Sequence, residues 1–438
     1  YKEGYILSDK YRDPIHGFIR VSKSENKIIN SLPFQRLRNI RQLAMTYLVF
    51  HGAEHTRFGH SLGVMFLVTK AFESAVDNAK ASGSYIFDAE KCAWYKQILR
   101  LIALTHDLGH APFSHASEAV FPEGMEHEDF TEKIVKETEI ADYISEIGQG
   151  FKEKYGSEYD ITPDLICDIY SGKNPGENYE FTFLKSFMDS ELDCDKMDYL
   201  LRDSLFCGVN YGRYDIERLL TCLTIHKQDE SPRLAITDGG IQALEEFVLA
   251  RYFMFIEVYF HRTRRYFDLM LARALSEVLP DGKYPDSTSE YLKWNDNKVL
   301  ELLAEKRDII EAAGNIIKRR VYPCIYSTKT HTAKADRQNF RMLKRSIFEK
   351  FDAEEFLVDT SAAKMPHKIP VKTDLDDEKA IIIVHRDTGM CSTISEESNI
   401  IQSLASKIDI YRLYVSPERH AEVRPVVQEI MRNCSEED

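Results

Sequence analysis

Hydrophobic residues recur at intervals of three and four along most of the first 320 residues, which is the spacing of one face of an α-helix. The pattern predicts helices over residues 62–81, 98–108, 129–147 and 215–223, and one long aromatic-rich helix over residues 241–279. Short strands are expected near residues 5–7 and 233–237. This part of the chain is therefore predicted to be mostly helical.

The pattern changes near Val321, where short β-type runs alternate with amphipathic helical segments. Strands are predicted at residues 321–326, 355–358, 380–385 and 408–415, and helices at residues 337–351, 395–406 and 417–432. We therefore expect a mostly α fold with two parts: a helical core over residues 1–320 and a smaller C-terminal α+β lobe over residues 321–438.

Composition limits the classes of protein that the chain can form. With 438 residues, of which 43% are hydrophobic, it can bury a large core. No apolar run approaches the roughly 18 residues that span a bilayer, and the first residues do not resemble a signal peptide, so we expect a cytoplasmic protein with no membrane partner. The 8 cysteines form no CxxC pair, so no structural zinc site or disulfide framework is expected.

The net charge of -14 makes nucleic acid an unlikely partner, because phosphate contacts need a basic surface. Three local basic clusters stand out against this charge: Arg36, Arg38 and Arg41; Arg262, Arg264 and Arg265; and Lys318, Arg319 and Arg320. Each is either a solvated face or a candidate for holding a polyphosphate.

The strongest chemical signal is the run His106-Asp107-Leu108-Gly109-His110. A His beside an Asp offers an imidazole nitrogen and a carboxylate oxygen to one divalent cation. Helical spacing from Ile98 onward places His106 and Asp107 at the end of a buried helix, where a site can be held rigidly. A core His beside a capping Asp would give the same pair, so the metal hypothesis depends on other segments.

Six ordered segments provide that support. They are Asp13-Pro14-Ile15-His16-Gly17, Phe34-Gln35-Arg36-Leu37-Arg38, Gln42-Leu43, Arg57 to Val64, Thr105 to His115 and Asp193 to Asp203. Over about Asp13 to Arg265 the chain resembles the HD-domain deoxynucleoside triphosphate triphosphohydrolases, including the branch with the vertebrate SAM- and HD-domain dNTPase and its bacterial homologues. The resemblance implies an HD-domain helical core and a metal-dependent enzyme that cleaves dNTPs to deoxynucleoside and tripolyphosphate.

The resemblance also implies the metal ligands, which are His60, His106, Asp107 and Asp195. Two imidazoles and two carboxylates neutralise a divalent ion and leave positions for water and a phosphate oxygen. Mg, Mn, Fe and Zn all suit this donor set, so the predicted cofactor is a divalent metal ion of unspecified identity.

The catalytic residues are carried over in the same way. In this family water attacks the α-phosphorus, so the departing 5′ oxygen must gain a proton, which an imidazole with a pKa near 6.5 can supply. His115 is the predicted acid, oriented by Glu118 where some relatives carry Asp. His110 and His127 are predicted to be further active-site histidines, with supporting or capping roles as the alternative.

The family pattern further implies how substrate is bound. The predicted substrate-binding residues are Gln42 and Leu43 at sugar and base, Arg57 and Lys196 at the phosphates, Tyr199 and Asp203 at the ribose end, and Tyr266 near the sugar. Asp203 could accept a hydrogen bond from the 3′ hydroxyl, and a tight wall at the 2′ position would exclude ribose.

Family members act as homo-oligomers, so a homodimer or homotetramer is expected, and regulated members bind a nucleotide effector between subunits. Gln35 and Arg38 match the effector-binding segment. Asn30 stands where an acidic residue reads guanine and Asp9 where a Lys contacts phosphate, which argues against activation by GTP.

Two alternatives stay open. One is an HD-type phosphohydrolase acting on another nucleotide, such as an NMP, a cyclic nucleotide or an alarmone, although the segments typical of the last two groups do not follow Asp107. The other is a catalytically silent nucleotide sensor, against which the complete ligand set and His115 argue.

Overall fold

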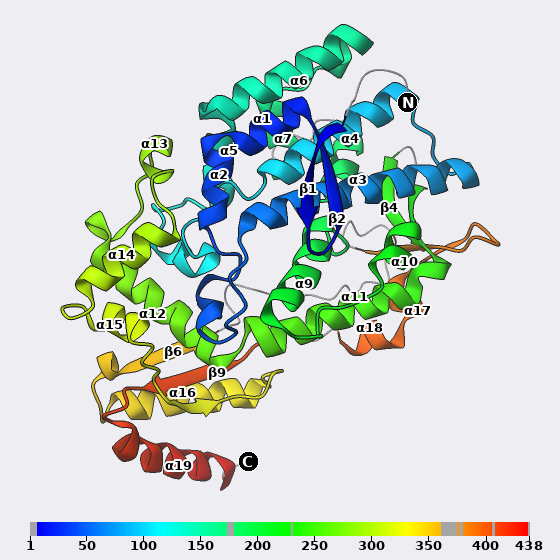
Figure 1. Cartoon of the computed structure of the whole chain (residues 1–438). Helices are drawn as coiled ribbons and strands as arrows, with labels where there is room; N and C mark the ends of the chain where they lie inside the picture. The colour runs from blue at the N-terminus through cyan, green and yellow to red at the C-terminus, as the bar shows by residue number, and fades with distance from the viewer. Residues whose placement is uncertain are drawn as a thin grey trace.

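The computed structural model describes residues 7–172, 179–228, 231–360, 375, 380–404 and 408–436. It has a helical core and a smaller α+β lobe, and the lobe lies at the bottom of the view in Figure 1. The predominance of helices confirms the predicted mostly α fold class. Within the described ranges, no helix is long and apolar enough to cross a membrane.

The N-terminal and central helices are α1 (Lys23–Asn30), α2 (Leu32–Arg36), α3 (Arg57–Ser82), α4 (Ala89–Thr105), α5 (His127–Glu137), α6 (Glu139–Tyr155), α7 (Pro163–Ser171), α8 (Tyr179–Ser186), α9 (Cys194–Cys207) and α10 (Ile216–Thr221). The later helices are α11 (Ile241–Met254), α12 (Arg262–Val278), α13 (Thr288–Tyr291), α14 (Asp296–Lys306), α15 (Glu311–Ile317), α16 (Lys334–Phe348), α17 (Ile394–Glu397), α18 (Asn399–Ser403) and α19 (His420–Glu436). The strands are β1 (Leu7–Asp13), β2 (Gly17–Ser22), β3 (Leu223–Gln228), β4 (Ser231–Thr237), β5 (Cys324–Ser327), β6 (Phe356–Thr360), β7 (Ile382–Val384), β8 (Cys391–Thr393) and β9 (Tyr411–Val415).

An antiparallel hairpin of β1 and β2 opens the described chain; of the strand expected near residues 5–7, Leu7 begins β1 and residues 5 and 6 lie outside the described residues. Gly17 sits at its turn with φ +74°, a conformation that glycine adopts without steric cost. Ser22 then starts α1 through a capping box with Glu25. Glu25 is fully buried and accepts hydrogen bonds from Arg100 of α4, which fixes the hairpin end to the helical core.

Two helices predicted as continuous are broken in the structure. The segment expected as one helix over residues 129–147 is α5 and α6, separated at Thr138, whose extended backbone and side chain cap α6. The long helix expected over residues 241–279 is α11 and α12, separated by a π-helical turn, Phe255–Tyr259, and by Phe260 and His261. Phe260 is buried against Ile408 and Ile410, so tertiary packing overrides helical continuity here.

The predicted boundary at residue 320 does not separate the sheets cleanly. The three-stranded sheet β5-β9-β6 lies in the C-terminal lobe, beside α16 and α19 (Figure 1). However, β7 pairs with β4 of the preceding region, giving the four-stranded order β3-β4-β7-β8. Ile381, Ile383 and Ile401 accordingly belong to the main hydrophobic core. Residues 380–404 are therefore part of the core rather than of the lobe.

Candidate metal and active site

Four predicted metal ligands meet where three segments of the helical core converge; they form the metal cluster (His60, His106, Asp107 and Asp195). His60 comes from α3, His106 and Asp107 follow α4, and Asp195 lies in the first turn of α9. One donor atom each from His60, His106 and Asp195 fall within 4.8 Å of one another. His60 Nε2 lies 2.8 Å from Asp195 Oδ1, and His106 Nε2 lies 3.5 Å from the same oxygen. Asp107 is also close, with oxygens 3.4 Å from His106 Nε2 and 3.7 Å from His60 Nε2.

Both imidazoles are oriented so that Nε2 faces this cluster. His60 Nδ1 lies 2.8 Å from an oxygen of Asp198, and His106 Nδ1 lies 2.8 Å from the carbonyl of Ala103. Metal-ligating histidines characteristically donate their second ring nitrogen to such acceptors, which fixes the tautomer. His106 Nε2 is buried with no hydrogen-bond partner among the described residues, an uncompensated polar atom that a cation would satisfy.

The electrostatic environment also suits a cation. Burial alone would lower the pKa of His60, but hydrogen bonding to Asp195 and Asp198 raises that pKa to about 10. A site that stabilises a proton so strongly concentrates negative potential on a few buried atoms. The donor set, orientation and charge therefore all fit a divalent metal ion.

A buried network behind His60 was not assigned from the sequence. Asp198 accepts hydrogen bonds from Arg202 at 2.7 and 2.9 Å and contacts His16 Nε2 at 2.6 Å; Arg202 also donates to Asp13 at 2.9 Å. Burial opposes ionisation of Asp198, yet the Arg202 charge and these hydrogen bonds hold its pKa well below the usual range. The signal was available, because Asp198 and Arg202 lie one helical turn apart within a segment already singled out.

Glycine at position 63 allows α3 to approach this network. A Cβ on Gly63 would collide with the Asp198 carboxylate and the Arg202 guanidinium. The close contact of α3 with α9 therefore depends on the absence of a side chain here.

Arg57 is predicted to bind phosphate, but in the structure its partners belong to the protein. Its Nη1 donates to Asp107 Oδ2 at 2.6 Å and its Nε donates to Ser114 Oγ at 2.8 Å. Burial by itself would raise the pKa of Asp107, whereas the Arg57 charge keeps it well below the usual range. Arg57 thus keeps Asp107 ionised while still lining the cavity described below.

The predicted catalytic residues form a second group, the histidine cluster (His110, His115, Glu118 and His127). Glu118 Oε1 lies 2.6 Å from His115 Nδ1 and 3.1 Å from His127 Nδ1. The rings of His110 and His127 stack with centroids 4.0 Å apart, and His110 Nε2 lies 3.3 Å from Asp107 Oδ1. Burial and the nearby Arg57 charge keep the pKa of His110 well below its ordinary value, so this ring is neutral at pH 7.

The turn after α4, which carries His110, is held in place by hydrogen bonds to its backbone carbonyls. Arg36 donates to the carbonyls of Leu108 and His110, and Tyr291 donates to the carbonyl of Gly109. A Cβ on Gly109 would collide with the backbone of His127, so this glycine lets α5 approach and deliver that histidine. Arg36 is therefore structural, and does not hold a polyphosphate.

A strained loop places His115. Phe113 and Ser114 have φ of 58° and 52°, the left-handed region that residues with a side chain adopt at a cost. The fully buried carboxylate of Asp296 in α14 accepts from the backbone N–H of Phe113 and of Arg41, both within 2.9 Å. Asp296 is not among the residues predicted from the sequence, since nothing in the sequence connects α14 to this loop.

Residues of both clusters border one cavity of about 560 Å³, whereas His60 and Glu118 are not among its lining residues. The predicted residues that line it are Gln42, Leu43, Arg57, His106, Asp107, His110, His115, His127, Asp195, Lys196, Tyr199 and Asp203. Lys196 Nζ donates to Asp193 at 2.6 Å. Burial raises the pKa of Tyr199 to about 12, so the Tyr199 hydroxyl stays protonated at neutral pH. Asp203 lies 2.8 Å from His55 Nε2 and accepts from the Tyr259 hydroxyl at 2.7 Å.

The prediction for Tyr266 is not supported by its position. Tyr266 is fully buried on α12, donates its hydroxyl to the carbonyl of Arg320 and lies beside Tyr322, away from the residues that line the cavity. Tyr259 lines the cavity instead.

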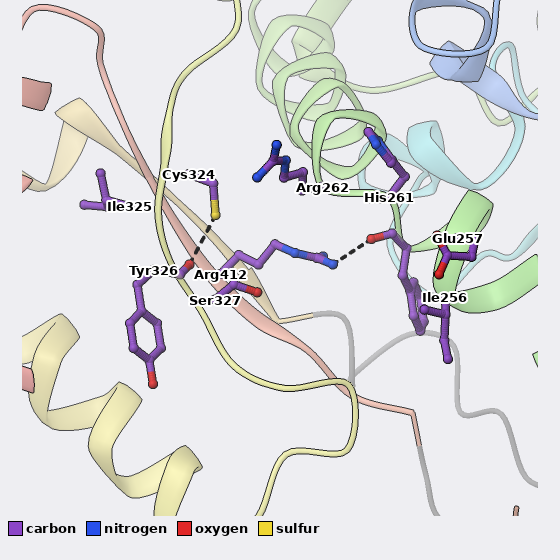
Figure 2. Close-up of a pocket in the computed structure, with 10 residues that line it drawn as sticks. Ile256, Glu257, His261, Arg262, Cys324, Ile325, Tyr326, Ser327 and Arg412 are labelled. Atoms are coloured by element: carbon purple, nitrogen blue, oxygen red, sulfur yellow. Dashed lines mark hydrogen bonds between the residues drawn. The ribbon is translucent and has the colours of Figure 1, made fainter. Parts of the chain in front are cut away.

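Of the other basic clusters, only Arg264 lines this cavity. Arg265 pairs with Asp359 at 3.0 Å, and Lys318 pairs with Asp308 at 2.9 Å. Arg262 instead borders a second cavity of about 490 Å³, where α12 begins beside β5 and β9 (Figure 2). There Arg412 donates to the carbonyl of Phe260 at 2.6 Å, across the junction of core and lobe.

Comparisons with known proteins show the family of the chain. Residues 57–170 match the family described as HD domain, and residues 214–433 match the family described as HD associated region. The uncharacterized protein YwfO of Bacillus subtilis is 28% identical over 93% of this chain and 92% of its own length. The crystal structure of a hypothetical protein from Aquifex aeolicus superposes with a TM-score of 0.76 at 31% identity, covering 95% of this chain and 99% of that one.

A relative with a named activity is more distant. The deoxynucleoside triphosphate triphosphohydrolase SAMHD1 of Homo sapiens is 25% identical over 92% of this chain and 71% of its own length.

Proposed function

Because the chain belongs to the HD-domain phosphohydrolases that carry an HD-associated region, we propose that it cleaves dNTPs to deoxynucleoside and tripolyphosphate. The observation that carries the proposal is the shared cavity, which is lined by three residues of the metal cluster and by His115, Lys196, Tyr199 and Asp203. The name of the SAMHD1 relative supports the dNTP assignment. The enzyme class itself follows from the family.

His60, His106, Asp107 and Asp195 are the residues that would hold the divalent ion. When bound, such an ion supplies Lewis-acid polarisation of a phosphate oxygen and a more acidic water. Arg57 contributes by keeping Asp107 ionised and in place.

His115 is the proposed source of the proton for the departing 5′ oxygen. Its Nδ1 contacts Glu118, which leaves Nε2 available to a substrate, and its side chain is 51% exposed, so an incoming nucleotide can reach it. The Glu118 carboxylate orients the ring. The longer Glu, in place of Asp, therefore still reaches the imidazole.

Recognition of the deoxynucleoside is assigned to the opposite end of the cavity. Both Asp203 oxygens have protein partners, His55 and Tyr259, which hold the carboxylate rigidly while spare lone pairs remain to accept from a 3′ hydroxyl. Gln42 and Leu43 lie on the cavity wall, where we assign them to sugar and base. Lys196 is the proposed phosphate contact.

A cytoplasmic homodimer or homotetramer with a nucleotide effector is part of the same proposal. Gln35 accepts from Arg38 at 2.8 Å, and Arg38 is exposed, as an effector-binding segment requires. Light scattering with and without nucleotide tests the assembly; a monomer under both conditions would contradict it.

The deciding experiment is to incubate the metal-loaded protein with each dNTP and NTP, alone and in pairs, and to assay tripolyphosphate. We expect release from at least one dNTP and none from the matching NTP. His115→Ala is the control, since it should bind nucleotide but release product far more slowly. Binding without release of tripolyphosphate, pyrophosphate or phosphate under every condition would favour a sensor. Turnover of only NMPs, cyclic nucleotides or alarmones would instead identify another HD phosphohydrolase.

A further inference from the structure

We propose that the histidine cluster is itself a second metal site, which takes a zinc-type ion and thereby inhibits the enzyme. The binding part of this inference stands on geometry alone. The inhibitory part rests on the proposed function of His115 as the acid, and the experiment below separates the two.

The donor atoms of the cluster are arranged like those of the metal cluster. One ligand atom from each of His110, His115, Glu118 and His127 lies within 4.8 Å of the other three, the same limit that His60, His106 and Asp195 satisfy. Glu118 Oε1 lies 2.6 and 3.1 Å from two Nδ1 atoms, and in the metal cluster Asp195 Oδ1 lies 2.8 and 3.5 Å from two Nε2 atoms. A carboxylate oxygen shared by two imidazoles is thus common to both clusters.

The nitrogen atoms are available for coordination. His110 Nδ1 is buried and has no hydrogen-bond partner within the described part of the chain, so this nitrogen can serve as a ligand. His115 Nδ1 faces Glu118 Oε1, and His127 Nδ1 faces both Glu118 Oε1 and Glu128 Oε2, the latter at 3.2 Å. A metal ion can replace the protons that these atoms share.

The chemistry of the donors selects the ion. Three imidazoles and one carboxylate complete a four-coordinate shell of the kind that Zn²⁺ prefers, whereas Mg²⁺ favours six oxygen ligands and retains water. The metal cluster carries two imidazoles and two carboxylates, a harder donor set. The two sites are therefore expected to differ in metal preference, with zinc and cobalt favoured in the histidine cluster.

Occupation would have a direct effect on the proposed reaction. Coordination through Nδ1 and Glu118 takes away the carboxylate that orients His115, and an imidazole ligated at Nδ1 has no free lone pair there for the second proton needed to act as an acid. Excess zinc should therefore reduce turnover while the ion in the metal cluster stays in place.

Cobalt titration tests the binding. Apoprotein titrated with Co²⁺ should take up two equivalents per chain, measured by visible absorption and by equilibrium dialysis. His127→Ala should bind one equivalent, Asp195→Ala should bind one with the spectrum of the other site, and His51→Gln, an exposed histidine outside both clusters, should still bind two. One equivalent in the wild type, or two in His127→Ala, would overturn the second site.

Zinc inhibition tests the consequence. Enzyme loaded with one Mn²⁺ should lose at least tenfold in turnover when Zn²⁺ is added, and a chelator should restore the activity. If Co²⁺ binds twice but no nucleotide is hydrolysed, the proposed function fails and the metal site remains. If two ions bind and zinc leaves turnover unchanged, the inhibitory part is overturned.

Discussion

The metal cluster and the histidine cluster border the same cavity, yet the surrounding fold supports them differently. In the metal cluster, each histidine presents Nε2 to the site and has Nδ1 fixed by an acceptor behind it, Asp198 or the Ala103 carbonyl. In the histidine cluster, His115 and His127 both use Nδ1 to contact one partly exposed carboxylate, Glu118. His60 is 1% exposed, whereas the His115 side chain is 51% exposed.

This difference matches what each cluster has to do. A metal site gains affinity from ligands whose orientation is settled before the ion arrives, so rigid partners behind each imidazole are useful. A proton donor must meet a substrate whose position changes during the reaction, so access matters more than rigidity. The strained Phe113 and Ser114 backbone then provides the fixed point from which His115 reaches the cavity.

The largest expected effect is the loss of the metal cluster itself. Asp195→Ala or Asp107→Ala leaves two imidazoles and one carboxylate, which should hold a divalent ion poorly, and turnover should fall to the detection limit. Metal analysis of the purified variants measures the first effect. Full occupancy in Asp107→Ala would show that the ligand set is wrong and that Asp107 serves only to anchor Arg57.

The next effect concerns the acid. His115→Ala should reduce turnover by roughly two to four orders of magnitude, the usual contribution of general acid catalysis, with nucleotide affinity and metal content nearly unchanged. Stopped assays paired with nucleotide-binding measurements check both quantities. A loss of metal from His115→Ala would contradict the assignment of metal binding to one cluster and proton donation to the other.

The sequence predicts the metal cluster better than it predicts the substrate pocket, for physical reasons. Helical spacing places His106 and Asp107 at the end of a buried helix, the resemblance to the family adds His60 and Asp195, and the structure brings the four side chains together. Tyr266 was assigned to the sugar by the family resemblance alone, and the helix break just before it depends on packing of Phe260 against Ile408 and Ile410, which local sequence does not encode. The pairing of β7 with β4, across more than 140 residues, is equally invisible to local patterns.

A smaller effect should come from the support behind His60. Asp198→Asn removes the negative charge that His60, His16 and Arg202 share, and metal affinity should fall by roughly 10- to 100-fold, as for other groups that orient a ligand. Competition with a fluorescent chelator measures the metal affinity of the variant. Glu118→Gln is the matched change in the other cluster and should leave affinity at the metal cluster unchanged.

The smallest effect tests the support of the His115 loop. Burial raises the pKa of Asp296 to about 6, although hydrogen bonds from Arg41 and Phe113 oppose the rise. Because this folded-state pKa exceeds the unfolded value of about 3.9, the folded protein binds a proton that the unfolded chain does not bind between about pH 4 and 6. The contribution of Asp296 to stability is therefore greatest at low pH and declines as pH rises through about 6.

Asp296→Asn should remove this pH dependence, since the amide does not titrate. At pH 7 the variant should lose about 1 to 3 kcal/mol in the free energy of unfolding, because its amide nitrogen cannot accept the second backbone N–H. The deficit relative to wild type should widen as pH falls from 7 to 5. Denaturant unfolding at both values measures it, with metal content as the control. An equal deficit at both pH values would mean that Asp296 does not titrate in this range. Unchanged turnover in the variant would mean that the hydrogen bond from Phe113 to Asp296 is not needed to place His115.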